Sequence, residues 1–149
     1  MSDPASILRP ALADWLRDDT EIVSAFNGNA VKVFARIPPV NAGYPYIWLA
    51  GLDIEDDTAE CLDATQAILQ IDVWSLTSPP SFTEAETIAA AVKASLTRME
   101  EDVGNSPEFS ISGFRVVAVQ HDRTQYLTDP SDGKTVHAMV RATLSVDPV

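Results

Sequence analysis

The fold of this chain is decided by residues 64–75, Ala-Thr-Gln-Ala-Ile-Leu-Gln-Ile-Asp-Val-Trp-Ser. Alternation between apolar and mixed side chains is typical of a strand with one buried and one wetter face. Residues 134–146 alternate in the same way, and the two runs predict long strands of a small antiparallel sheet. The side chains expected to face the core are Ala67, Leu69, Ile71 and Val73 in the first run, and Val136, Ala138, Val140, Ala142, Leu144 and Val146 in the second.

Between these runs, residues 82–103 predict a helix, because apolar residues recur there at helical spacing. Ser81 and Glu84 have the spacing of a capping box at its start. Near the N-terminus a second apolar stripe predicts a helix after Asp3-Pro4, with Pro10 either kinking it or marking its first turn. A short helix is expected over residues 21–26, capped by Asp19 or Thr20.

Three further strands are expected at residues 31–37, 46–52 and 114–125. The segment 53–63 between two strands is dense in acidic residues, which repel one another and favour a solvated arm. The sequence therefore predicts an α+β fold in a single domain, residues 1–149. An antiparallel sheet of about five strands carries helices on one face, and an extended acidic hairpin joins strands two and three.

The composition of the chain limits the classes of function that it can have. The net charge of −12 opposes adhesion to nucleic acid, although an acidic wall would let DNA slide past without sticking. A single cysteine, Cys61, excludes an internal disulfide framework. No secretory signal or membrane-spanning apolar run is visible in the sequence.

Residues that could carry chemistry are few. His121 and His137 lie on expected neighbouring strands, where Asp122 and Asp132 could join them in a metal site, or they are two exposed strand histidines. The acidic segment could hold a hard cation or be a solvated loop or subunit-contact arm. Cys61 has no base in its sequence neighbourhood. We therefore expect no catalytic residue, no metal and no cofactor.

Several motifs follow one another in an order that identifies a family resemblance. They are Tyr44-Pro45-Tyr46-Ile47, Leu69-Gln70-Ile71-Asp72-Val73-Trp74-Ser75, the helix over 86–96, Phe114-Arg115-Val116 and His137-Ala138-Met139-Val140-Arg141. In this order and spacing the chain resembles the tail completion, or tail terminator, proteins of long-tailed bacteriophages, prophages and gene transfer agents. The resemblance runs over almost the full length.

The resemblance implies a structural protein of the virion, not an enzyme. Such proteins form a hexameric ring at the head-proximal end of the tail tube, in the neck region. The ring stops growth of the major tail tube protein, meets the head–tail connector or stopper protein, and lets DNA pass without specific binding. Assembly in the bacterial cytoplasm, without a membrane, is implied too. The alternatives are a small ligand- or protein-binding module that uses the loop 38–44, and a hydrolase or metal-dependent enzyme built on the histidines.

A ring needs a second buried surface on each protomer. The candidates for this subunit interface lie on the outward sheet face, unless the N-terminal helices cover them: Tyr46, Trp48, Ile68 and Trp74. The acidic segment is expected to reach a neighbour or to line the lumen, through Asp53, Glu55, Asp56, Asp57, Glu60 and Asp63.

Overall fold

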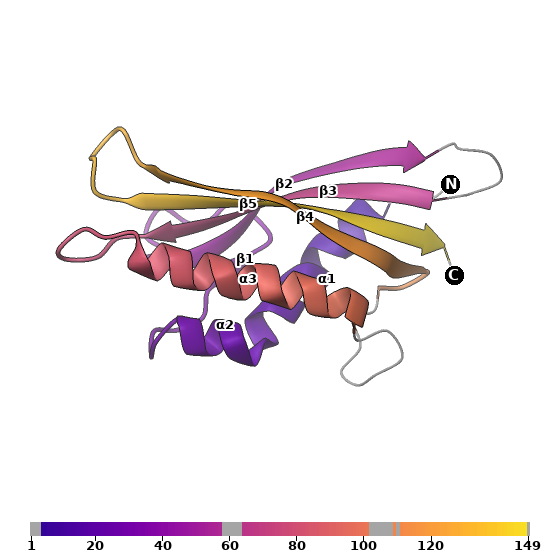
Figure 1. Cartoon of the computed structure of the whole chain (residues 1–149), viewed down its shortest axis with the longest axis horizontal. Coiled ribbons are helices and arrows are strands. Elements are labelled where there is room, and N and C mark those ends of the chain that lie inside the picture. The colour runs from indigo at the N-terminus through magenta and orange to yellow at the C-terminus, as the bar shows by residue number, and fades with distance from the viewer. Residues whose placement is uncertain (1–3, 58–63, 102–108, 110, 149) are drawn as a thin grey trace.

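The computed structural model describes residues 4–57, 64–101, 109 and 111–148 (Figure 1). Within them one sheet has the strand order β1-β2-β3-β5-β4. All the labelled helices lie on one side of this sheet (Figure 1), which confirms the α+β class. The elements are α1 (Ala5–Asp18), α2 (Thr20–Ala25), β1 (Val33–Phe34), β2 (Tyr46–Asp57), β3 (Ala64–Ser75), α3 (Thr83–Glu101), β4 (Phe114–Thr128) and β5 (Val136–Pro148).

The two runs that alternate in the sequence are neighbours in the middle of the sheet. β3 pairs with β5 along its length, from Thr65↔Val146 to Ser75↔Val136. The expected inward residues of both strands are buried under the helices, so the predicted faces are confirmed. Burial of this continuous apolar layer is the main favourable term in the stability of the fold.

The first strand differs from the prediction. β1 spans only Val33–Phe34 and runs parallel to β2, where antiparallel pairing over residues 31–37 was expected. The chain turns through the segment 35–45 and re-enters the sheet in the same direction. Residues 35 and 36 form a bend directly after β1, and Pro38 and Pro39 beyond it have no N–H to donate to a ladder.

A β-bulge in β2 reverses the faces of that strand. Leu49 pairs with Ile71, but the next pair along is Gly51 with Gln70, so Ala50 is the extra residue. Gly51 leaves room there, because an added Cβ would lie 3.1 Å from Cβ of Gln70, a tight contact that Gln70 would have to relieve by a small shift. As a result Leu52 and Ile54 pack against the core, whereas Asp53 and Glu55 lie on the opposite face.

The observed N-terminal caps of the helices agree only in part with the caps predicted from the sequence. Asp19 caps α2, as one of the two expected candidates, by accepting from the backbone of Glu21 (2.9 Å) and Ile22 (3.1 Å). The capping box predicted at α3 is wrong. Ser81 accepts from the backbone N–H of Thr83, but Glu84 turns to the sheet and accepts a 2.6 Å hydrogen bond from Oγ of Ser75. Pro10 lies inside α1.

Polar side chains fasten the helices to each other and to the sheet. Arg9 of α1 donates to the carbonyl of Leu49 beside the bulge (3.1 Å). Trp15 of α1 donates to the backbone carbonyl of Ser95 in α3 (3.1 Å). Arg98 of α3 forms an ion pair with the buried carboxylate of Asp19 and a second one with Glu21. These contacts fix the helix layer relative to the strands.

The ion pair between Asp19 and Arg98 predicts acid sensitivity. Burial tends to raise the pKa of Asp19, but hydrogen bonds from Arg98 and from the backbone of Ile22 outweigh it and leave the pKa below 3.8. A lowered folded-state pKa gives stability that is complete above 3.8 and is lost as the pH falls through the folded pKa. Asp19→Ala should lower the free energy of unfolding by about 2 kcal/mol near neutral pH, because a cap and a charged hydrogen bond disappear.

Urea unfolding at a series of pH values measures this effect. Asp19→Asn is the matched control, because the amide oxygen can still cap α2 but carries no charge. It should lose less stability near neutral pH and should flatten the fall in stability below pH 3.8. An Asp19→Asn variant that keeps the full acid dependence would assign that dependence to other carboxyl groups.

β2 and β3 pair antiparallel as far as Asp57 and Ala64. Glu60, Cys61 and Asp63 lie outside the described residues, so the extended acidic hairpin stays a prediction. Among the described helices, none is long and apolar enough to cross a bilayer.

Candidate interaction surface

The face of the sheet opposite the helices is bare in the part of the chain that the structure describes (Figure 1). We call it the outward face. The strand register arranges its side chains in rows across β2, β3, β5 and β4. Successive rows are Tyr46–Trp74–His137–Leu127, Trp48–Asp72–Met139–Gln125, Gly51–Gln70–Arg141–Arg123 and Asp53–Ile68–Thr143–Gln120. All of the predicted interface residues, Tyr46, Trp48, Ile68 and Trp74, lie on this face and are partly exposed.

One end of the outward face is aromatic. Trp74 and His137 stack with ring centroids 3.9 Å apart. Nε2 of His137 lies 3.1 Å from Oδ2 of Asp72, whose other carboxylate oxygen accepts from Gln70 (3.1 Å). Burial raises the pKa of Tyr46, and the nearby Tyr44 and Asp72 raise it further. This end thus combines large flat side chains with a buried acid, which suits a protein contact better than a solvated surface.

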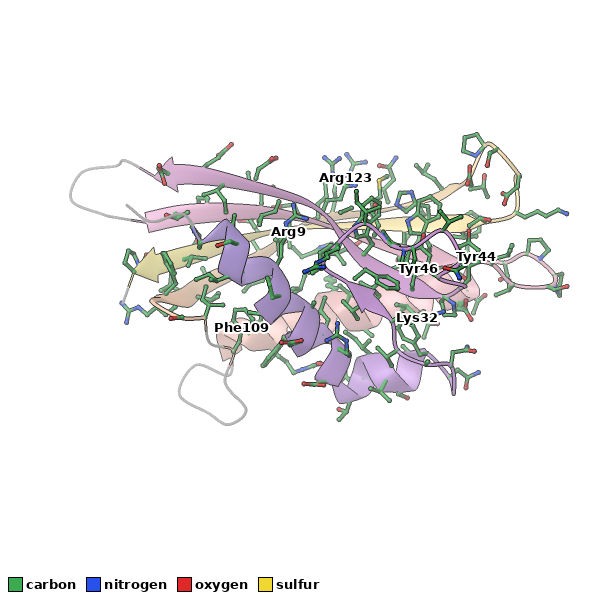
Figure 2. All side chains as sticks on the ribbon, turned by 180° about the vertical axis from the view of Figure 1, so that it is seen from behind. Arg9, Lys32, Tyr44, Tyr46, Phe109 and Arg123 are labelled. Atoms are coloured by element: carbon green, nitrogen blue, oxygen red, sulfur yellow. The ribbon has the colours of Figure 1, made fainter. Side chains whose placement is uncertain are left out.

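The loop that precedes β2 is held at the same end. Nζ of Lys32 donates to the carbonyls of Ala42 (2.8 Å) and Gly43 (2.9 Å), and Tyr44 stacks on Tyr46. Figure 2 shows these labelled side chains gathered together. Ile37 and Val40 project from this loop and are among the most exposed apolar side chains, with Ile37 82% exposed. Lys32 thus fastens the end of a loop that displays apolar side chains to solvent.

An arginine pair lies midway along the strands of the outward face, on β5 and the edge strand β4. Arg123 of β4 is directly opposite Arg141 of β5. Both are exposed, and Figure 2 shows Arg123 on the side away from the helices. Arg141 donates to Gln70 (3.3 Å) and Arg123 to Gln125 (3.1 Å), but neither forms an ion pair within the described residues. Sequence analysis places Arg141 outward but does not pair it with Arg123, because the alternation of each strand gives no register between the two strands.

The acidic residues of β2 lie beyond the arginine rows. Asp53 and Glu55 are exposed on the outward face, and Asp56 is exposed on the other face. These carboxylates have no ion pair with any described residue. Asp57 ends the strand, and the remaining predicted acids, Glu60 and Asp63, fall outside the described residues. The described acids therefore belong to a paired strand and not to a free loop.

The two histidines do not converge. His121 pairs with Ala142, which faces the helices, whereas His137 is on the outward face. His121 is hydrogen-bonded to Thr124 (2.7 Å), and burial with the nearby Lys93 lowers its pKa, although Asp122 opposes this. Asp132 is used in the β4–β5 turn. Within the described residues no His, Cys, Asp and Glu side chains gather in a group of three that could hold a metal.

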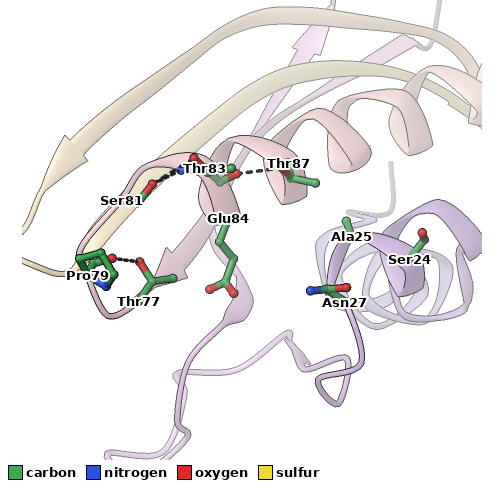
Figure 3. Close-up of a pocket in the computed structure, with 9 residues that line it drawn as sticks. All are labelled: Ser24, Ala25, Asn27, Thr77, Pro79, Ser81, Thr83, Glu84 and Thr87. Atoms are coloured by element: carbon green, nitrogen blue, oxygen red, sulfur yellow. Dashed lines mark hydrogen bonds between the residues drawn. The ribbon is translucent and has the colours of Figure 1, made fainter.

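A hollow of about 540 Å³ lies between α2 and the start of α3 (Figure 3). Hydroxyl groups dominate its lining, and the carboxylate of Glu84 points into the space between Thr77 and Asn27. Oε1 of Glu84 is already occupied by Ser75. The hollow is open and polar, with a single carboxylate, and offers no nucleophile–base pair among its lining residues.

Taken together, fold and surface define a small α+β domain whose distinctive side chains lie on a bare sheet face and form no catalytic constellation in the described residues. Such a domain is typical of proteins that act by assembly. The sequence profile of the family described as "Tail completion protein gp17" matches residues 10–147, and the chain belongs to this family. The family resemblance seen in the sequence is thereby confirmed.

A solved structure has the same fold. It is a chain of the "Virion of native gene transfer agent (GTA) particle", with a TM-score of 0.78, 18% sequence identity, and coverage of 99% of each chain. No curated protein sequence matches this chain.

Proposed function

We propose that this chain is a virion structural protein that forms a ring on the head-proximal end of the tail tube. The ring ends tube growth, joins the tube to the head connector or stopper protein, and lets DNA pass through its lumen. Membership of the tail completion family over residues 10–147 is the observation that carries this proposal. The fold shared with a chain of a gene transfer agent virion along nearly the whole length supports it.

The outward face supplies one of the surfaces that a ring needs. A closed ring uses two different patches on each protomer, one for each neighbour. Aromatic residues, Met and Arg are enriched at protein interfaces, and Tyr46, Trp48, Trp74, Met139 and the arginine pair gather here. Ile68 adds apolar area in the next row. We assign this face to the subunit interface of the ring.

The charge of the protein suits a channel for DNA. A net charge of −12 repels phosphate, so DNA would not adhere to the wall of the lumen. The acids from Asp53 to Asp63 either line that lumen or contact a neighbour. In this role the protein transforms no substrate, and it acts by closing and orienting an assembly.

Polymerisation of the cognate tube protein tests the proposal. Tubes grown with this chain present should be shorter than tubes grown without it, and electron microscopy should find one ring at one end of each. The other end of each tube should carry no ring. Tubes that grow to the same length and carry no added density would reject the proposed function.

A protein-binding module that does not form a ring is the second candidate. The hydrogen bonds from Lys32 to the end of this loop favour it, because they restrict the loop that displays Ile37 and Val40 and so lower the entropic cost of binding. Ile37→Asp/Val40→Asp separates the two readings. A module that works through the loop would lose its partner, whereas a ring built on the outward face would still close.

A further inference from the structure

The arginine pair is unfavourable within the protomer. Like charges directly opposite each other on neighbouring strands destabilise a sheet. The chain holds 22 acidic residues against 10 basic ones, so carboxylates to neutralise the pair are abundant. Yet among the described residues the side-chain partners of Arg123 and Arg141 are glutamine oxygens. Asp122, next in the chain, accepts instead from Oγ1 of Thr143 (2.8 Å). Two guanidinium groups that have no ion pair with a described residue, side by side on a bare face, are arranged for an anion from outside.

The matching anions lie on the same chain. We define the acidic arm as Asp53, Glu55 and Asp56, the exposed carboxylates near the end of β2. Within the protomer β3 separates the arm from β5, and no ion pair joins the arm to the arginines. Arm and pair are therefore complementary in charge, and neither has an ion pair with a described residue of its own copy. A second copy of the chain would supply the missing partner of each.

The free edges of the sheet are poorly suited to extend the sheet into another copy. β4, the edge strand, has irregularities at Val117 and Asp122, and β2 has its bulge at Ala50 and its charged end. Bulges and charges on an edge are the devices that prevent strand-to-strand pairing. The contact between copies is then made by side chains on the face. The arm has carboxylates on both faces of β2, so it can approach the outward face of another copy from the edge of its own sheet.

We propose that the acidic arm of one copy docks on the Arg123–Arg141 pair of the next copy. Guanidinium groups bind carboxylates with paired, directional hydrogen bonds, which gives register as well as attraction. The contact joins two different patches, so each bound copy keeps a free arm or a free pair for another neighbour, and a ring closes if the rotation allows. This inference rests on the proposed function and names the contact that holds its ring. DNA phosphate is the competing anion, but the aromatic rows beside the pair favour protein.

Charge exchange tests the contact in the full chain. The pair variant is Arg123→Glu/Arg141→Glu, and the arm variant is Asp53→Lys/Glu55→Lys/Asp56→Lys. Each alone brings like charges together and should self-associate about tenfold or more weakly than the wild type, by sedimentation velocity. An equimolar mixture of the two should regain assembly, because acids then meet lysines and arginines meet acids. Both variants keep a negative net charge, so overall attraction cannot explain the rescue.

Control variants keep the outcome clear. Lys93→Glu/Lys134→Glu changes net charge as much as the pair variant at exposed sites in α3 and the β4–β5 turn, and should assemble normally. If a reversal variant does not fold, Arg123→Gln/Arg141→Gln replaces it, with a smaller loss expected. Added salt should weaken wild-type assembly and should affect this glutamine variant less.

Several results would overturn the inference. The inference is wrong if the pair variant assembles normally or if the equimolar mixture stays dissociated. It is also wrong if the wild type stays monomeric both alone and on tube ends. A pair variant that loses only affinity for duplex DNA would assign the arginines to phosphate. The proposed function is judged separately. Capping by the pair variant at normal stoichiometry refutes this contact alone, whereas charge-dependent rings that ignore tubes refute the function alone.

Discussion

Trp48→Ala should leave the protomer folded and should weaken ring formation and tube capping by about 30-fold or more. Trp48 lies on the outward face between the aromatic row and the arginine row, and it is only partly buried in the protomer. Truncation of a tryptophan at the centre of an interface typically costs at least about 2 kcal/mol of binding, which corresponds to that factor. Tube length in the polymerisation assay and sedimentation velocity both measure the loss.

Phe82→Ala is the matched control for this prediction. Phe82 is also a partly exposed aromatic residue, 39% exposed, but it precedes α3 and lies off the outward face. Its truncation should change neither assembly nor capping. Equal losses in both variants would point to a general effect of removing surface aromatics. Normal capping by Trp48→Ala, with an unchanged unfolding curve, would remove the outward face from the ring interface.

The sequence predicts best where one periodicity acts without interruption. β3 and β5 alternate over their full lengths, and every residue expected to face the core is buried. The predicted helical stripe from Ala85 to Met99 is also buried, because α3 lies across β3, β4 and β5. In both cases nothing interrupts the periodicity, so the pattern correctly assigns which side chains face inward.

Prediction from sequence fails where one extra residue shifts the inward–outward alternation of side chains along a strand. The bulge at Ala50 turns Asp53 and Glu55 to the outward face, and the irregularity at Val117 turns His121 to the helix side. An extra residue in one strand leaves no mark in the hydrophobic pattern of its neighbour. The irregularity at Asp122 then restores the phase that begins at Phe114, so Arg123 faces outward and His121 does not. The arginine pair was missed because the alternation does not give the register that places Arg123 opposite Arg141, although Arg141 itself was correctly placed outward.

The capping box at α3 failed for a different reason. Glu84 has the right spacing from Ser81, but a buried hydroxyl of Ser75 competes for its carboxylate. A tertiary hydrogen bond from the end of β3 replaces the local one. The spacing of residues in the sequence indicates only local hydrogen-bond partners. A side chain at the start of a helix can instead bind a residue of another segment that packs against it. The outward face avoids this ambiguity, because no described helix lies on it.

Phe26→Ala should have the largest effect on stability and little effect on the surface of the ring. Phe26 closes the C-terminal end of α2 and has no exposed area. Removing a fully buried phenylalanine side chain costs about 3–5 kcal/mol through lost burial and the cavity that remains. For a chain of this size the midpoint of thermal unfolding should fall by about 10 °C. Phe82→Ala, the same substitution at an exposed site, should stay within about 0.5 kcal/mol.

Temperature then separates stability from assembly. Phe26 lies in the helix layer, whereas the interface residues belong to β2, β3, β5 and β4 on the other face. Well below its unfolding midpoint, the Phe26→Ala protein should cap tubes like the wild type, and it should lose capping only as it unfolds. Trp48→Ala should show the reverse, a normal unfolding curve with capping lost at every temperature. If Phe26→Ala lost capping while still fully folded, the helix layer would have to be part of the ring contact.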